Sequence, residues 1–185
     1  GLGDVYKRQI MEDKIFGSSG LNVVIEEYLI GPEVSVLCFT DGKTISPMVT
    51  SMDHKRANDN DEGLNTGGMG TVAPNPYYTQ EISDICMEKI FIPTIEAMNS
   101  ENRKFKGCLY FGLMLTEEGP KVIEYNCRFG DPETQVVLPL LDTDLLTVFE
   151  AVIDEKLEDI DIKWKDECAA CVISVSYTHL TLPTT

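Results

Sequence analysis

The sequence has no long apolar run and few positive charges. No stretch approaches the roughly 20 apolar residues that a membrane span needs, and residues 1–9 lack the apolar core of a secretory signal. Only 15 lysines and arginines stand against 31 acidic residues, which gives a net charge of −16. Such a surface repels a phosphate backbone. We therefore expect no nucleic-acid partner, no membrane partner and a cytoplasmic location.

The six cysteines do not form the pattern of a zinc site or a disulfide framework. Only Cys168 and Cys171 have C-x-x-C spacing, and no second pair or nearby histidine completes a set of zinc ligands. Free cysteine packs as a small hydrophobic residue. We expect this pair to be buried thiols, and a structural metal site there is the alternative.

Apolar periodicity predicts a mixed α+β domain with much antiparallel sheet. Asp41-Gly42 is typical of a hairpin turn within an opening meander. Pro93 should interrupt the first long helix, and Thr143 is placed to cap the second, whose apolar face holds Leu145, Val148, Phe149, Val152 and Ile153. The expected strands are 21–29, 33–40, 43–49, 109–115 and 121–127, and the expected helices are 80–99 and 144–157.

Residues 51–78 are rich in Gly, Asn, Asp and Pro, and their glycines are clustered in the run NTGGMG at 65–70. A long segment without regular structure inside a compact domain is usually functional or disordered, and the clustering favours a ligand loop. His54, Lys55 and Arg56 precede it. A phosphate contact is expected there, because bare glycine backbone lets an anion approach closely; a solvated turn is the alternative.

The pattern Glu124-x-Asn126-x-Arg128 carries the strongest chemical signal. Alternation along a strand puts these three side chains on one face, and turns the intervening Ile123, Tyr125 and Cys127 into a core. A carboxylate and an amide oxygen suit Mg²⁺ whose remaining ligands are substrate phosphates, and a guanidinium suits the phosphoryl group. A solvated strand face with an incidental ion pair is the other interpretation.

Four segments together resemble the phosphoribosylamine–glycine ligases, also called glycinamide ribonucleotide synthetases, which are ATP-grasp enzymes of purine synthesis. The segments are VIEEYLIG (24–31), DHKR (53–56), NTGGMG (65–70) and EYNCRFGDPETQ (124–135). They follow the family order between about residues 10 and 173. The resemblance implies an α+β ATP-grasp fold that is only partly present, namely the second half of the grasp.

The resemblance also implies roles for individual residues. The nucleotide ATP would lie against Glu26, Glu27, Tyr28, Leu29, Glu33 (at the ribose), Arg56 and Asn65. Glu124 and Asn126 would bind Mg²⁺ (or Mn²⁺), and Arg128 would be the catalytic arginine near the transferred phosphate. The substrate side, for glycine and 5-phosphoribosylamine, would include Gly68, Met69, Asp131 and Glu133.

The implied reaction activates the glycine carboxylate as a glycyl phosphate, which the amine of 5-phosphoribosylamine then attacks. The family's N-terminal domain, its phosphate-gripping lysine and its C-terminal domain have no counterpart here, so we expect the isolated chain to be inactive. Residues 1–9 and 174–185 match neither the pattern nor the composition of the segments beside them. We expect them to be a non-native leader and a non-native tail around a partial domain at 10–173. The alternatives are a non-catalytic nucleotide-binding module, or another ATP-grasp enzyme such as a biotin carboxylase or a purine-pathway carboxylase.

Overall fold

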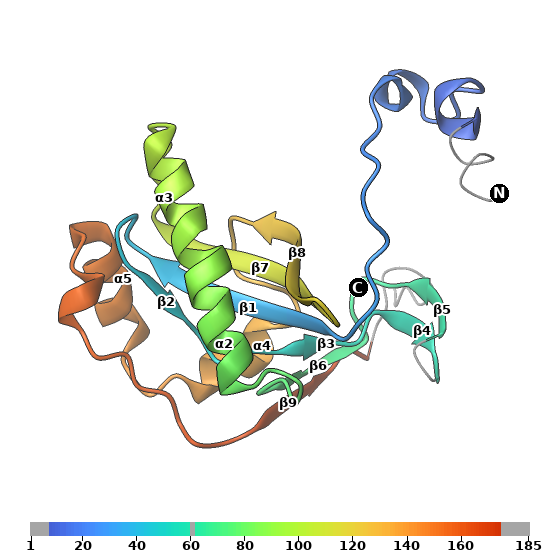
Figure 1. Cartoon of the computed structure of the whole chain (residues 1–185). Helices are drawn as coiled ribbons and strands as arrows, with labels where there is room; N and C mark the ends of the chain where they lie inside the picture. The colour runs from blue at the N-terminus through green and yellow to red at the C-terminus, as the bar shows by residue number, and fades with distance from the viewer. Residues whose placement is uncertain (1–7, 60–61, 175–185) are drawn as a thin grey trace, which may run out of the picture.

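The computed structural model describes residues 8–59 and 62–174. The expected leader at 1–9 and tail at 174–185 lie outside the described residues apart from positions 8, 9 and 174, so those two interpretations stay untested. Figure 1 shows a central sheet flanked by helices, with the short helix η1 (Gly17–Leu21) held away from it on an extended segment. None of the described helices is long and apolar enough to cross a lipid bilayer.

In the part of the chain that the structure describes, the central sheet has the order β2-β1-β7-β8, with all neighbours antiparallel. The Asp41-Gly42 hairpin is confirmed. Oδ1 of Asp41 accepts the backbone N–H of Lys43 at 2.9 Å and of Thr44 at 2.7 Å, and Gly42 has a φ of +85° that favours glycine. The strands are β1 (Glu33–Thr40), β2 (Ile45–Pro47), β7 (Gly107–Thr116) and β8 (Gly119–Asn126), which confirms four of the expected five.

Strand β1 is buried on both faces and holds the two halves of the core together. Val34 and Val36 pack with the helices on one face of the sheet, while Leu37 and Phe39 pack with those on the other. Full burial of each such side chain contributes roughly 1.5–3 kcal/mol. The helices therefore pack against both faces of the sheet. The C-terminal end of β8, with Tyr110 of β7 beside it, lines a pocket.

The first helical layer is α2 (Gln80–Cys86), η3 (Met87–Phe91) and α3 (Ile92–Ser100). The expected interruption is confirmed, since η3 is a π-helical turn in which the N–H of Ile92 bonds to the carbonyl of Met87. Pro93 has no N–H and its ring would clash with the carbonyl four residues earlier. A wider turn directly before the proline accommodates that carbonyl.

The second helical layer is α4 (Thr134–Val137), η4 (Leu138–Leu140), α5 (Leu145–Asp154) and η5 (Leu157–Asp159). Thr143 as the cap of α5 is wrong. Asp144 is the cap, with Oδ2 accepting the N–H of Thr147 at 2.9 Å, while Thr143 accepts the N–H of Lys163 at 2.8 Å. The buried face is Val148, Ala151 and Val152, whereas Phe149 and Ile153 lie at its edge with 36% and 69% of their surface exposed.

Residues 51–78 are not a structureless loop, which corrects the expectation. They contain β3 (Met52–Asp53), β4 (Arg56–Asn58), β5 (Glu62–Asn65) and β6 (Gly70–Ala73). Strands β4 and β5 form a two-stranded ribbon, and β3 and β6 form a small antiparallel sheet with β9 (Ala169–Val172). Gly68, at φ +115°, lies in the turn between β5 and β6, and Gly63, at φ +85°, lies within β5. At both positions the glycine permits a backbone conformation that other residues rarely adopt.

Three further expectations about burial are wrong. Residues 21–29 form no strand in the described chain, and Val24 and Ile25 are more than 80% exposed; a strand needs a hydrogen-bonded neighbour, which an apolar run does not supply by itself. Ile123, Tyr125 and Cys127 are exposed instead of buried, since β8 is the edge strand of the described sheet. Tyr125 keeps 49% of its surface exposed although its hydroxyl lies 3.4 Å from that of Thr94 on α3. Cys168 is exposed and Cys171 only partly buried.

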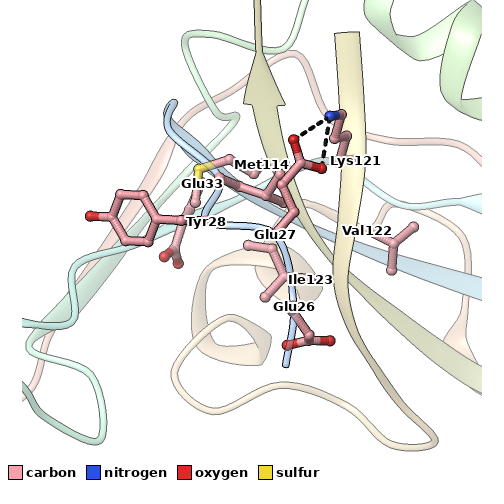
Figure 2. Close-up of a pocket in the computed structure, with 9 residues that line it drawn as sticks. Glu26, Glu27, Tyr28, Glu33, Met114, Lys121, Val122 and Ile123 are labelled. Carbon is pink, nitrogen blue, oxygen red and sulfur yellow. Dashed lines mark hydrogen bonds and ion pairs between the residues drawn. The ribbon is translucent and has the colours of Figure 1, made fainter. Parts of the chain in front are cut away.

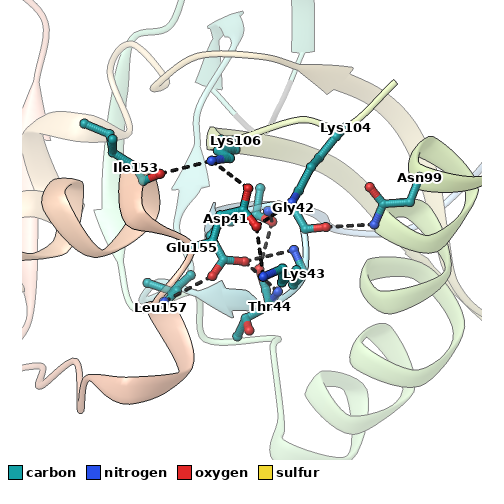
Figure 3. Close-up of polar contacts among 11 residues, drawn as sticks. Asp41, Gly42, Lys43, Thr44, Asn99, Lys104, Lys106, Ile153, Glu155 and Leu157 are labelled. Atoms are coloured by element: carbon teal, nitrogen blue, oxygen red, sulfur yellow. Dashed lines mark hydrogen bonds and ion pairs between the residues drawn. The ribbon is translucent and has the colours of Figure 1, made fainter. Parts of the chain in front are cut away.

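A cluster of polar contacts joins the C-terminal end of α5 to two loops (Figure 3). Glu155, in a left-handed conformation at φ +58°, pairs with the ammonium groups of Lys43, Lys104 and Lys106 at 2.9, 2.7 and 2.8 Å. These three cations lower the pKa of Glu155 far below its usual range. Because Lys43 lies in the β1–β2 connection and Lys104 and Lys106 lie in the α3–β7 connection, the cluster ties both connections to α5.

Candidate active site

Glu124, Asn126 and Arg128 line one small pocket at the end of β8, together with Thr66 and Gly67 of the glycine-rich run. We call this the β8 pocket; its volume is about 160 Å³, and its other lining residues are Asp53, Lys55, Tyr110, Asp131 and Glu133. The expected common face of the three polar side chains is therefore observed. The same pocket also brings the two separate sequence motifs together.

Strand register explains how Glu124 reaches this pocket. Asn126 lies opposite Tyr110 and Glu124 opposite Gly112, with a bulge directly after Gly112. A Cβ on Gly112 would lie 2.9 Å from Cγ of Glu124. Because Gly112 has no side chain, the Glu124 side chain can occupy the space beside it. The bulge bends β8 at this point and changes the direction of the side chains that follow.

Glu133, a buried carboxylate with only 3% of its surface exposed, also lines the β8 pocket. Its Oε1 accepts hydrogen bonds from the hydroxyls of Ser35 and Tyr110, both at 3.1 Å, and those two hydroxyl oxygens are 2.8 Å apart. Burial and the neighbouring Glu133 raise the pKa of Tyr110 well above its usual range, so it stays protonated. Two buried hydroxyls therefore fix the position of Glu133 from behind.

Asp53, at the end of β3, lines the same pocket and lies close enough to Glu133 to feel its charge. Burial raises the pKa of Asp53 to about 6, and the carboxylate of Glu133 adds to the rise while Lys55 opposes it. Its Oδ1 is enclosed but accepts no hydrogen bond from any described residue. Gly68 lies above this atom, since a Cβ there would be 3.1 Å from Oδ1.

Lys55 separates the β8 pocket from a larger neighbouring pocket and lines both. Its ammonium group is 3.0 Å from Oε2 of Glu33. Burial works against the charge of Lys55, but Glu33, assisted by Asp53 and Glu124, outweighs it and raises the pKa of the lysine. Lys55 is thus a firmly charged cation where the two pockets meet.

Two further pockets continue from Glu33 along the chain. The Arg56 pocket, of about 620 Å³, is lined by Arg56, Asn65, Glu33, Tyr28, Leu29 and neighbouring residues. The Glu27 pocket, of about 300 Å³, is lined by Glu26, Glu27, Tyr28, Leu29, Glu33, Met114 and Lys121, among others (Figure 2). Both have the volume of a small-molecule site. In Figure 2 the carboxylate of Glu27 points to Lys121, whose ammonium group is 3.1 Å away.

The expected site residues are mostly gathered in these three connected pockets, with two exceptions. Gly68 is buried against Pro132 and Asp53 and lines none of the three. Met69 serves the backbone instead: its N–H donates to His54 at 2.7 Å and its carbonyl accepts from Ile173 at 3.1 Å. For both, the structure shows a role in holding the glycine-rich turn.

Several pocket residues were not among the predicted site residues. Asp53 and Lys55 stand inside the DHKR segment, so their place in the motif was a usable signal. Tyr110, and Ser35 which contacts it behind the pocket, carried no such signal. Their roles depend on the pairing of β1 with β7 and of β7 with β8, which brings them under Glu133.

Comparison with known proteins agrees with this arrangement. The family model described as phosphoribosylglycinamide synthetase, ATP-grasp (A) domain, matches residues 5–134. The chain belongs to this family. Its α+β architecture is accordingly part of an ATP-grasp domain, and the alternative of a biotin carboxylase or another ATP-grasp family is set aside.

Individual relatives of the phosphoribosylglycinamide synthetase family are longer than this chain. It is 48% identical to the phosphoribosylamine–glycine ligase of Caldanaerobacter subterraneus over 167 residues, which is 90% of this chain and 40% of that protein. It is 51% identical to the trifunctional purine biosynthetic protein adenosine-3 of Gallus gallus over 89% of this chain and 16% of that protein. The crystal structure of the Thermotoga maritima phosphoribosylamine–glycine ligase superposes with a TM-score of 0.65 and 31% identity, over 80% of this chain and 37% of that one.

Proposed function

We propose that this chain is the part of a phosphoribosylamine–glycine ligase that binds the metal and much of the nucleotide. The whole enzyme would join glycine to 5-phosphoribosylamine in cytoplasmic purine biosynthesis, with ATP converted to ADP and phosphate. The observation that carries the proposal is the convergence of Glu124, Asn126 and Arg128 with Thr66 and Gly67 in one pocket. The names of the relatives supply the identity of the substrates.

The residues present fit a magnesium (or manganese) ion that is shared with phosphates. Glu124 and Asn126 offer one carboxylate and one amide oxygen from the same strand face. Among the described residues no three His, Cys, Asp or Glu side chains form a complete metal cage. Mg²⁺ commonly takes one or two protein ligands and completes its shell with water and phosphate oxygens. When bound, the ion would neutralise charge on those oxygens.

The neighbouring pockets fit the rest of the nucleotide. Their lining holds both acceptors, such as Glu33, and cations, such as Lys55 and Arg56. The chain has a net charge of −16. Cations beside the β8 pocket would offset this charge locally and bind the phosphates of a nucleotide. Lys55 would turn from Glu33 towards the phosphates as they enter.

The chemistry follows from charge placement. A free carboxylate is a poor electrophile, so the γ-phosphate of ATP would first be transferred to a glycine carboxylate oxygen, forming glycyl phosphate and releasing ADP. The amine of 5-phosphoribosylamine would then attack the acyl carbon, and inorganic phosphate and a proton would leave. Arg128 would stabilise the charge that develops on the moving phosphoryl group. The turn at Thr66 and Gly67 would keep water from the intermediate.

Magnesium-dependent ATP binding to this chain tests the proposal. Isothermal titration with ATP, with and without Mg²⁺, would compare the wild type with Glu124→Ala and with Glu150→Ala, an exposed glutamate on α5. We expect Mg²⁺ to strengthen ATP binding in the wild type and in the control. In Glu124→Ala that gain should fall about tenfold or more, as for a lost contact to a charged group. Equal magnesium dependence in Glu124→Ala and the wild type would overturn the metal assignment.

A chimera tests the catalytic part. This segment would replace the corresponding region of the Caldanaerobacter ligase, to which it is 48% identical, and product formation from glycine, 5-phosphoribosylamine and ATP would be measured. Activity is expected in the chimera and not in the isolated chain. A folded, nucleotide-binding chimera without activity would favour the second candidate, a non-catalytic nucleotide-binding module.

A further inference from the structure

Three phenylalanine rings from distant segments meet at the residue that follows Arg128. Phe39 comes from β1, Phe149 comes from α5, and Phe129 lies between β8 and α4. The ring centroids are 6.3 Å apart for Phe39–Phe129, 6.4 Å for Phe39–Phe149 and 6.3 Å for Phe129–Phe149, with interplanar angles of 72°, 76° and 66°. We call these three residues the phenylalanine cluster. Each ring meets the other two edge to face, which is an arrangement that aromatic rings favour.

The backbone at Arg128 and Phe129 has little other support. Strand β8 ends at Asn126 and α4 begins at Thr134, so both residues lie in the connection between them. In the described chain, neither residue makes a backbone hydrogen bond to another segment. The position of such a connection depends on the packing of its side chains. At this point the packing is supplied by the ring of Phe129 against the other two rings of the cluster and the core behind them.

The guanidinium of Arg128 is tied to the same residue. Its Nη1 donates to the backbone carbonyl of Phe129 at 2.8 Å. Arg128 is exposed and lines the β8 pocket. An exposed arginine side chain has many rotamers, and a bond to the next carbonyl restricts them. The position of the guanidinium in the pocket therefore follows the position of the Phe129 backbone, which the rings determine.

Phe149 is the most accessible member of the cluster. It keeps 36% of its surface exposed, whereas Phe39 is 1% exposed and Phe129 is partly buried. A partly exposed ring contributes less to folding than a fully buried one, and the buried face of α5 does not include it. A substitution at Phe149 can therefore change how Phe129 is held while the chain still folds.

We propose that the phenylalanine cluster positions Arg128 for phosphoryl transfer, with Phe129 and Phe149 as positioning residues. This inference rests on the proposed function, in which Arg128 stabilises the charge on the transferred group. A displacement of about 1 Å in a group that must meet a reacting atom can cost about a hundredfold in rate. Helix α5 lines no part of the β8 pocket, so it contributes to the reaction through this contact and without touching a substrate.

The mobility of the Arg128 guanidinium in the ligand-free chain tests the inference. The sequence has four arginines, so the side-chain ¹H–¹⁵N signals of their Nε groups are few, and Arg128→Lys assigns the signal of interest. The heteronuclear NOE of each Nε reports motion on the picosecond-to-nanosecond timescale. In the wild type we expect a higher value for Arg128 than for Arg103, which is exposed and lies outside the cluster.

Phe149→Leu should lower the Arg128 value towards that of Arg103, and Phe149→Tyr, which keeps the ring, should retain the wild-type value. Phe129→Leu is the second variant, in case Phe149→Leu does not fold. Ile95→Ala is the matched control, because it removes a buried side chain from the other core cluster and costs stability without touching the connection. An Arg128 value that is unchanged in both leucine variants, lowered equally in Ile95→Ala, or lost in Phe149→Tyr would overturn the inference.

Calorimetric titration with ATP and Mg²⁺ gives the second readout. Phe149→Leu should weaken binding about threefold or more in the wild-type background. The weakening should nearly vanish in an Arg128→Ala background, because the cluster acts through that guanidinium. Equal weakening in both backgrounds would overturn the inference. A wild-type chain that binds no ATP would instead overturn the proposed function, whereas the NOE comparison, made without ligand, would still decide whether the cluster positions Arg128.

Discussion

Replacing Asp53 by asparagine should make the folded chain more stable at neutral pH. The substitution keeps the shape of the side chain and removes its charge. Burial raises the pKa of Asp53 from 3.8 to about 6, with Glu133 adding to the rise. Folding therefore favours the protonated form, and ionisation at neutral pH acts against the fold.

The sign and size of the effect follow from linkage. A group whose folded pKa is raised contributes stability below its unfolded pKa, here about 4, and loses that contribution as pH rises through about 6. A difference of about two pKa units corresponds to about 3 kcal/mol at most. Because Asp53 is only partly buried, solvent screening reduces this to about 1–2 kcal/mol. Asp53→Asn should gain that amount above pH 7 and almost nothing near pH 4.

Urea unfolding of both chains at several pH values between 4 and 8 measures the difference. The two free energies of unfolding should nearly coincide at pH 4 and separate by about 1–2 kcal/mol at pH 7.5, with the variant the more stable. Two outcomes would refute this reasoning: a difference in the free energy of unfolding that does not change with pH, or a variant that is less stable at pH 7.5. Either would mean that the ionised Asp53 does not destabilise the folded chain. Extra stability from a charge deletion inside a pocket is typical of a functional residue.

Three further substitutions test other features. Gly112→Ala should displace Glu124, because the new Cβ would lie 2.9 Å from its Cγ; magnesium-dependent ATP binding should fall while unfolding by urea changes little. Asp144→Ala should lower the free energy of unfolding by about 1 kcal/mol through loss of the α5 cap, with Glu150→Ala as an unchanged control. Glu155→Gln should lower the melting temperature, and the loss should shrink in high salt, because three lysine ammonium groups lose their shared partner.

The shared polar face at the end of β8 was predictable because side chains along a strand alternate with a period of two. Glu124, Asn126 and Arg128 needed only a regular strand to share a face, and the structure supplies it up to Asn126. The same reasoning failed for Ile123 and Tyr125, which are 40% and 49% exposed; Ile123 is the extra residue at the bulge, where the alternation breaks. Alternation decides which side chains go together, whereas burial depends on whether a helix covers that part of the sheet.

The surroundings of Glu133 in the β8 pocket could be described only from the folded chain. Glu133 was recognisable from its motif, but the two hydroxyls that hold it come from residues 98 and 23 positions away in the chain. No spacing rule connects Ser35 to Glu133, because the contact depends on the register of β1 against β7. The residues proposed to bind metal and phosphate lie within five positions at the end of β8 and directly after it, so they leave a motif. The buried cluster of Ser35, Tyr110 and Glu133, built from three distant segments, becomes visible only when hydrogen-bond donors and acceptors are counted in the folded chain.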